Sequence, residues 1–166
     1  SVALWPHGVL FRDSELEMRK KMIEDDLVEA VIGLGKNLFY NSSMESCLLI
    51  CNMNKPQKRK GKVIFIDGKD EVRLERSTAY LKDEHIKRMS DAYWSFKDED
   101  GFAAVVKTKN ILKENNGNLS IQLYVKTVST DSTQSIEDLL FTINDNRNSL
   151  EDGYNKLNSK LKELGI

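Results

Sequence analysis

Residues 27–52 have the sequence LVEAVIGLGKNLFYNSSMESCLLICN, in which two apolar runs flank a polar loop. Both runs are short, rich in Val, Ile, Leu and Cys, and bounded by Gly, Asn and Ser. This pattern is typical of buried β-strands. The loop between them, residues 36–43, carries the adjacent aromatic side chains Phe39 and Tyr40, so we expect it to be the functional surface.

The residues before this stretch predict a strand followed by a helix. Residues 2–5 form a short apolar run that ends at Pro6, as expected for a buried strand entering a turn. Asp13 or Ser14 can cap a helix that has an apolar stripe over residues 16–27. Such a crossover normally joins parallel neighbours in a sheet that is covered on both faces.

The residues after this stretch predict further strands and one helix. Two strands, at residues 46–53 and 62–67, are joined by a polar loop, which fits an antiparallel hairpin at the edge of the sheet. The elements predicted beyond it are a helix at 82–96, a short strand at 101–107, a turn at 115–118 and an alternating, half-buried strand at 119–125.

The C-terminal part of the sequence has a seven-residue apolar period. Residues 127–135 are a Ser/Thr/Asp-rich linker in which Val128 is the single apolar residue. The seam that follows consists of Ile136, Leu140, Ile143, Leu150, Tyr154, Leu157, Leu161 and Leu164. A seam of this kind predicts a long helix that needs a partner helix. The alternatives are packing against its own domain or against a second copy of the chain.

Several motifs occur in an order and spacing that resemble a known family. They are PHGVLF at 6–11, RKKMIEDDLVEAVIGL at 19–34, NLFY at 37–40, NMNKP at 52–56, RKGKVIFID at 59–67 and NLSI at 118–121. Over roughly residues 2–125 the chain resembles the modification (M) subunit of type I restriction–modification systems. Members of that family are adenine-specific DNA methyltransferases that use S-adenosylmethionine.

The resemblance implies an α/β fold. It would be the C-terminal half of a Rossmann-like methyltransferase sheet, with parallel strands plus an antiparallel edge hairpin, followed by a long C-terminal helix. On this interpretation residues 1–126 are the C-terminal part of the catalytic domain, residues 127–135 are the linker, and residues 136–164 dock on the specificity (S) subunit. The expected partners are DNA, the S subunit, the restriction subunit and the rest of the M subunit, with a homodimer as an alternative.

The resemblance also assigns a role to the aromatic loop. Methylation of adenine in duplex DNA requires the base to leave the stack and be held against an aromatic or apolar side chain. The family position for this base stacking is Phe39, with Tyr40 in support. Residues 41–44 stand where the family usually has a glycine. The catalytic Asn-Pro-Pro-aromatic turn of the family is absent, because Pro6 and Pro56 are the only prolines and neither follows Asn.

A cofactor cradle is not recognisable in the sequence. The segment Gly33-Leu34-Gly35 superficially resembles one, but it lacks a third glycine and a helix start. We therefore expect S-adenosylmethionine in the parent enzyme, none bound to this chain alone, and no activity of this chain alone. The alternative function is a non-enzymatic subunit-docking module from a truncated or split gene.

Basic residues gather in the loop before the strand at 62–67. They are Lys55, Lys58, Arg59, Lys60 and Lys62. These side chains could contact DNA phosphates, and a solvated loop tip is the simpler alternative. The formal net charge of −1 gives no global attraction to nucleic acid, so any DNA contact must come from such a local patch.

The remaining residue patterns exclude several classes of protein. Cys47 and Cys51 lie on one face of a predicted strand, too far apart for a disulfide, so we expect buried free thiols. Neither His7 nor His85 lies at ligand spacing from a cysteine, and no metal site is expected. No stretch approaches the roughly 20 apolar residues of a membrane span, and no signal peptide is visible, so the cytoplasm is the default expectation.

Overall fold

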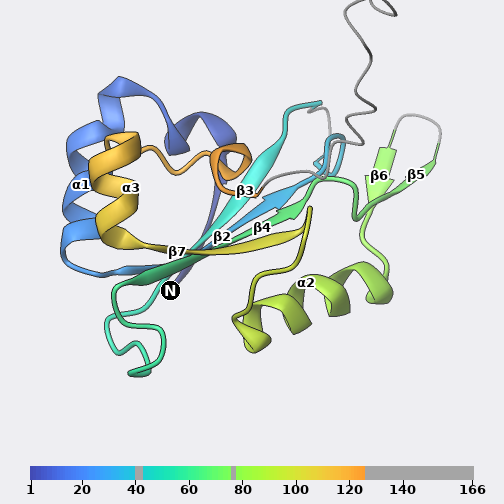
Figure 1. The fold of residues 1–166 in the computed structure, drawn as a ribbon. Coiled ribbons are helices and arrows are strands. Elements are labelled where there is room, and N and C mark those ends of the chain that lie inside the picture. Colours follow the sequence, from blue (N-terminus) through green and yellow to red (C-terminus); the bar gives the residue numbers. More distant parts are fainter. Residues whose placement is uncertain (40–42, 76–77, 126–166) are drawn as a thin grey trace, which may run out of the picture. The chain divides into compact units, whose positions relative to one another are not determined.

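The computed structural model describes residues 1–39, 43–75 and 78–125. Figure 1 shows a mixed α/β chain, which confirms the α/β part of the predicted fold class. Its elements in chain order are β1 (Val2–Pro6), η1 (His7–Leu10), η2 (Asp13–Glu15), α1 (Leu16–Glu24), β2 (Val28–Leu34), β3 (Ser46–Cys51), β4 (Lys62–Gly68), β5 (Arg73–Glu75), β6 (Thr78–Tyr80), α2 (Asp83–Ser95), β7 (Ala103–Lys107), α3 (Thr108–Asn115) and η3 (Ile121–Leu123).

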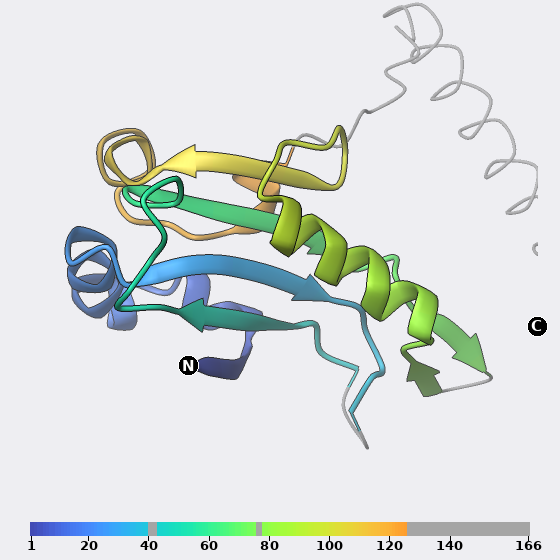
Figure 2. The ribbon, with the colours of Figure 1, turned by 90° about the horizontal axis from the view of Figure 1, so that it is seen from below.

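Five strands form one sheet in the order β1-β3-β2-β4-β7 (Figure 2). β3 pairs antiparallel with both β1 and β2, whereas β4 pairs parallel with β2. β7 forms the far edge, antiparallel to β4. The two apolar runs of residues 27–52 are therefore confirmed as strands, β2 and β3, and they pair directly. A separate antiparallel pair, β5 and β6, follows β4.

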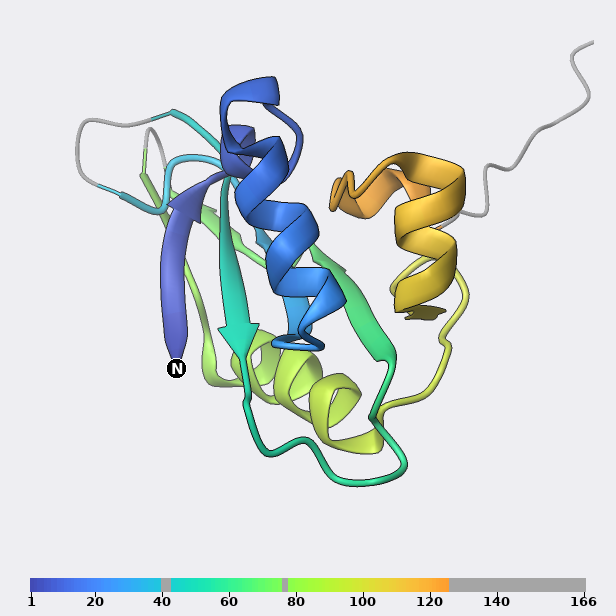
Figure 3. The same cartoon turned by 90° about the vertical axis from the view of Figure 1, so that its left-hand side faces the viewer.

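Helices cover both faces of this sheet (Figure 3). α1, α3 and η3 pack on one face, and α2 packs on the other. Successive residues of β4 point to opposite faces, so Phe65 joins the core under α1 and α3 while Ile64 and Ile66 join the core under α2. All seven residues of β2 are buried, since this strand is enclosed by neighbouring strands and by both helical layers.

The predicted edge hairpin is wrong. β3 and β4 run in opposite directions, but β2 lies between them, so the loop of residues 52–61 crosses the beginning of β2. The first strand is also not buried: Val2 and Leu4 of β1 are 62% and 49% exposed. β1 and β2 run in the same direction without being neighbours. Apolar content predicts that a strand forms, but pairing depends on contacts distant in sequence.

The segments after β4 agree with the prediction only in part. The helix at 82–96, the strand at 101–107 and the turn at 115–118 are confirmed, and Asn116 and Gly117 adopt positive φ angles of 49° and 73°. Residues 119–125 are not a strand. They contain the 3-10 helix η3, and the Tyr124 ring stacks on Phe65 with 4.1 Å between ring centroids. α3 and the β5–β6 pair were not predicted.

The start of α1 differs from the predicted cap. Asp13 and Ser14 belong to the 3-10 turn η2, and Glu15, at the N-cap position, makes no side-chain cap hydrogen bond. The linker of residues 127–135, the seam of residues 136–164 and the side chain of Tyr40 lie outside the described residues. They stay predictions.

Candidate functional site

The loop after β2 carries Phe39 out of the core. Asn37 adopts a left-handed conformation with a φ of 61°, which Asn tolerates better than most residues, and its carbonyl accepts a hydrogen bond from the Ala79 N–H at 2.9 Å. Leu38 then packs into the core under α2. The next side chain, Phe39, is 38% exposed. The loop is therefore anchored directly before a partly exposed aromatic ring.

An apolar hollow lies beside this ring, between the loop and the end of β1. Its volume is about 210 Å³, and it is lined by Leu4, Trp5, Pro6, Phe39, Met44, Glu45 and Ser46. Leu4 and Trp5 reach it because β1 is an edge strand whose side chains are not covered by the sheet. Shape and lining suit a flat, weakly polar group that rests against an aromatic ring.

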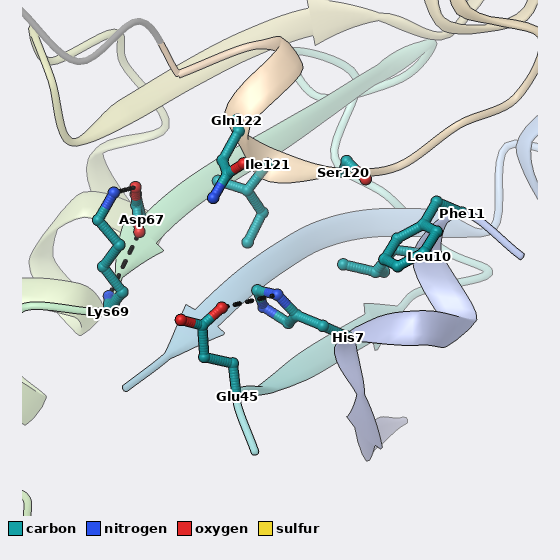
Figure 4. A pocket seen from close by; sticks show the side chains of 9 residues that line it. All are labelled: His7, Leu10, Phe11, Glu45, Asp67, Lys69, Ser120, Ile121 and Gln122. Carbon is teal, nitrogen blue, oxygen red and sulfur yellow. Dashed lines mark hydrogen bonds and ion pairs between the residues drawn. The ribbon is translucent and has the colours of Figure 1, made fainter. Parts of the chain in front are cut away.

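A second, more polar hollow of about 280 Å³ lies close by (Figure 4). His7 Nδ1 lies 3.6 Å from a carboxylate oxygen of Glu45, and Lys69 Nζ lies 3.0 Å from Asp67 Oδ2. The hydrogen bond to Asp67, and then its charge, raises the pKa of Lys69. Glu45 lines both hollows and also lies 3.5 Å from Lys36 Nζ, so the two hollows share one edge of the sheet.

Gly33 and Gly35 do not fit a cofactor cradle. A Cβ at Gly33 would lie 2.9 Å from Ile121 Cδ1, and one at Gly35 would lie 2.6 Å from the carbonyl oxygen of Lys69. The space over both glycines is thus filled by the chain itself. These residues are glycines because other segments pack against the end of β2, and no donor-binding step is assigned to them.

The basic run is divided by the fold into internal and exposed side chains. Lys55 is 5% exposed, and its ammonium group donates to Asp26 Oδ1 at 2.6 Å and to the carbonyl of Lys62 at 3.0 Å. Arg59 is likewise held inside, as described next. Lys58 and Lys60 are exposed and Lys62 is half-buried. Phosphate contact therefore stays a prediction for these three lysines, whereas Lys55 and Arg59 have structural partners.

Arg59 and Glu29 form a buried ion pair at the start of β2. Arg59 Nη1 lies 3.0 Å from Glu29 Oε1, and their side chains are 11% and 1% exposed. The Glu29 carboxylate also accepts hydrogen bonds from Asn52 at 2.9 Å and from the Tyr93 hydroxyl at 3.2 Å. Burial alone would raise the pKa of Glu29, but these hydrogen bonds and the Arg59 charge lower it below its usual value.

The two cysteines are free thiols, as predicted. Burial raises the pKa of Cys47 to about 11, and burial also raises the pKa of Cys51. Both thiols therefore stay protonated near neutral pH and offer no nucleophile. In the part of the chain that the structure describes, no three His, Cys, Asp or Glu side chains are placed to hold a metal ion. No helix among those residues has the length and apolar character needed to cross a bilayer.

Phe39 was a site residue predicted from the sequence, whereas the β1 side of the hollow beside it was not predicted. Trp5 and Met44 carry no motif of their own, and only their exposure identifies them as lining residues. The one sequence feature that could have indicated this side of the hollow is an aromatic residue directly before Pro6, at the end of an apolar run. Only the position of β1 at the edge of the sheet shows that this aromatic residue lines a hollow.

Comparison with known proteins connects this geometry to one group of enzymes. Residues 2–133 match the family described as N-6 DNA methylase. The chain is 35% identical over 161 residues to the type I restriction enzyme MjaVIII methylase subunit of Methanocaldococcus jannaschii, covering 95% of this chain and 28% of that subunit. It is 40% identical over 122 residues to the MjaVII methylase subunit of the same organism, covering 71% of this chain and 21% of that subunit.

A solved structure agrees with these relatives. The crystal structure of the type I restriction-modification system methyltransferase subunit from Streptococcus thermophilus superposes with a TM-score of 0.69 at 35% sequence identity, covering 75% of this chain and 26% of that chain. The chain thus spans about a quarter of the length of the relatives that it matches.

Proposed function

Because this chain belongs to the N-6 DNA methylase family, among the modification subunits of type I restriction–modification systems, we propose that it forms one wall of the site at which such a subunit methylates adenine in DNA. The observation that carries the proposal is the partly exposed Phe39 ring at the rim of an apolar hollow. The position of Phe39 beside this hollow is an observation independent of the family match, since it follows from the β2–β3 loop and the edge position of β1.

Phe39 has the chemistry that base capture needs. An adenine that is methylated within duplex DNA must first swing out of the stack, and it then loses stacking with its neighbours. The face of the Phe39 ring can replace that stacking, while Leu4, Trp5 and Met44 keep water from the buried side of the base. Tyr40, the next residue in the chain, is proposed to support the ring.

S-adenosylmethionine would supply the methyl group in the parent enzyme. Since Gly33 and Gly35 do not fit it, we assign to this chain the holding of the target base and not the binding of the donor. The donor site and the catalytic Asn-Pro-Pro-aromatic turn are proposed to belong to other parts of the M subunit.

The partners proposed for this chain follow the same assembly. Residues 136–164 would dock on helices of the specificity subunit through their heptad seam. The rest of the M subunit, the restriction subunit and DNA would join in the full complex. Substituting Leu150 and Leu157 by Asp is expected to abolish capture of the S subunit in a pull-down.

Methyl transfer by a reconstituted complex tests the role of Phe39. The chain would be mixed with a polypeptide that carries the remaining M-subunit motifs and with the S subunit, and incorporation of radioactive methyl groups into DNA would be followed. Phe39→Ala is expected to lower the initial rate roughly 10- to 100-fold, because a base stacked on an aromatic side chain gains about 1–3 kcal/mol. Phe39→Trp should retain most of the rate.

Phe11→Ala is the matched control, since Phe11 is an exposed phenylalanine that lines the other hollow. It should leave the rate within about twofold of the wild type. An unchanged rate for Phe39→Ala would contradict the proposal. Capture of the S subunit by a complex that never methylates would favour the docking module instead.

A further inference from the structure

A groove of about 700 Å³ lies at the opposite end of the sheet from Phe39. The loop of residues 52–61, the end of α2 and the edge strand β7 contribute Lys58, Lys97 and Val105 to its lining. This end is where β2 begins, whereas Phe39 follows the end of β2. Seven strand residues separate the two, a distance of about 20 Å. The groove and the Phe39 hollow are therefore separate surfaces of one compact unit.

Lys58, Lys62 and Lys97 line this groove, and further lysines lie near them. Lys58, Lys60, Lys97 and Lys107 are exposed. Lys62 and Lys107 are cross-strand partners in the β4–β7 register, so their side chains emerge next to each other on the same face. Like charges placed directly opposite are unfavourable. Such a pair is favoured when an anion from outside lies between the two ammonium groups.

Carboxylates of the described residues do not neutralise these lysines. Two acidic side chains at this end, Asp26 and Glu29, are paired with Lys55 and Arg59. Asp98, next to Lys97, accepts a hydrogen bond from the Val105 N–H at 2.7 Å. Within the described ranges no ion pair with a carboxylate is made by Lys58, Lys60, Lys62, Lys97 or Lys107. The local charge is positive although the whole chain is nearly neutral.

The floor of the groove is aromatic. Trp94 is 69% exposed, and the Arg59 guanidinium carbon lies 5.8 Å from the centre of its ring and 4.6 Å from that of Phe96. Arg59 also donates hydrogen bonds to the carbonyls of Tyr93 and Trp94, at 3.1 and 3.0 Å. The end of α2 is therefore fixed to the loop that carries Lys58. Several ammonium groups beside an exposed indole suit a sugar–phosphate backbone.

We propose that this groove binds the backbone of duplex DNA, independently of sequence, at a place distinct from the Phe39 hollow. The proposal deepens the proposed function, because it gives a DNA-directed protein a second DNA contact. The test of this groove does not involve methyl transfer. A failure of the groove proposal can therefore be distinguished from a failure of the proposed function. Lys58, Lys62, Lys97 and Lys107 supply the charge, and Trp94 packs against the sugars.

The salt dependence of DNA binding by the 166-residue chain tests the proposal. Affinity for a fluorescent duplex would be measured by anisotropy at several salt concentrations. The triple variant Lys58→Gln, Lys97→Gln and Lys107→Gln is expected to lower affinity at least tenfold at about 50 mM salt. It should also reduce the slope of log affinity against log salt by about 2 to 3, since each lost phosphate contact removes about 0.9.

The control variant has the same change in charge at other exposed sites: Lys21→Gln, Lys82→Gln and Lys113→Gln. It should keep the wild-type slope, and circular dichroism should show both triple variants folded. Equal slopes for the two triple variants would overturn the proposal. Groove-dependent binding of poly-L-glutamate without groove-dependent binding of duplex DNA would also overturn it, and would assign the groove to an acidic protein segment.

Discussion

Arg59 joins three parts of the structure through one guanidinium group. It pairs with Glu29 on β2, donates to the carbonyls of Tyr93 and Trp94 at the end of α2, and lies over the Phe96 ring. Both charges of the ion pair are removed from water. Removing one partner of such a pair leaves the other charge buried without compensation, which costs about 3–5 kcal/mol.

Arg59→Ala is therefore expected to lower the free energy of unfolding by about 3–5 kcal/mol. Urea denaturation followed by circular dichroism measures the change. Arg73→Ala, at an exposed position on β5, is the matched control and should change stability by less than about 0.5 kcal/mol. A loss below about 1 kcal/mol for Arg59→Ala would show that the pair contributes little.

Glu29 makes this stability depend on pH. Its pKa is lower in the folded chain than the usual value of 4.5 that it takes when unfolded. Its stabilising contribution is therefore fully present above that usual value and is lost as the pH falls through the folded pKa. The stability difference between wild type and Glu29→Gln is expected to be largest near pH 7 and to shrink in acid.

Urea denaturation at neutral pH and at stepwise lower pH measures this difference. Glu24→Gln, at an exposed position on α1, serves as the control and should show no such narrowing. A gap between wild type and Glu29→Gln that stays constant from neutral to acid pH would contradict the assignment.

At the scale of elements, the end of β2 depends on close backbone packing. A Cβ at Gly35 would lie 2.6 Å from both the carbonyl oxygen of Lys69 and Val72 Cγ1, so the segment after β4 would have to shift. Gly35→Ala is expected to destabilise the chain by about 1–3 kcal/mol. Thermal denaturation measures the change.

Gly8→Ala is a matched control for this overpacking. The nearest atoms that its Cβ would meet belong to the Arg12 guanidinium group, the first at 2.5 Å, and this flexible end can move away. Equal melting temperatures for the two variants would show that the Gly35 contact is not limiting.

At the scale of the whole molecule, β1 leaves one edge of the sheet open. Val2, Leu4 and Trp5 expose 62%, 49% and 45% of their surface along this edge. An edge strand with unpaired backbone groups and exposed apolar side chains is a template for another strand. In the proposed assembly the rest of the M subunit would cover it.

The isolated chain is therefore expected to self-associate as its concentration rises. Leu4→Lys combined with Trp5→Lys should reduce this association and should weaken binding to the remaining M-subunit polypeptide. Light scattering over a concentration series measures the first effect. Leu74→Lys, on the exposed strand β5, is the control. A chain that is monomeric throughout, with or without these substitutions, would exclude the open edge as an interface.

The amino-acid pattern was sufficient to identify β2, β3, α2 and the enzyme family. Apolar periodicity and motif spacing are properties of contiguous residues, so they can be recognised without coordinates. The position of Phe39 could likewise be predicted from contiguous residues, because it follows from a motif and from the strand next to it. The thiols of Cys47 and Cys51 were also predictable from the apolar run that contains them.

The order of the strands and the burial of each lysine could be determined only from the tertiary structure. Lys55 and Lys58 are equivalent in sequence, yet one is buried against Asp26 and the other lies in solvent at the groove. The difference comes from a partner 29 positions away. Pairing across such distances depends on how the loop of residues 52–61 crosses the beginning of β2. No local pattern encodes that crossing, because its energy resides in contacts that exist only after the sheet has formed.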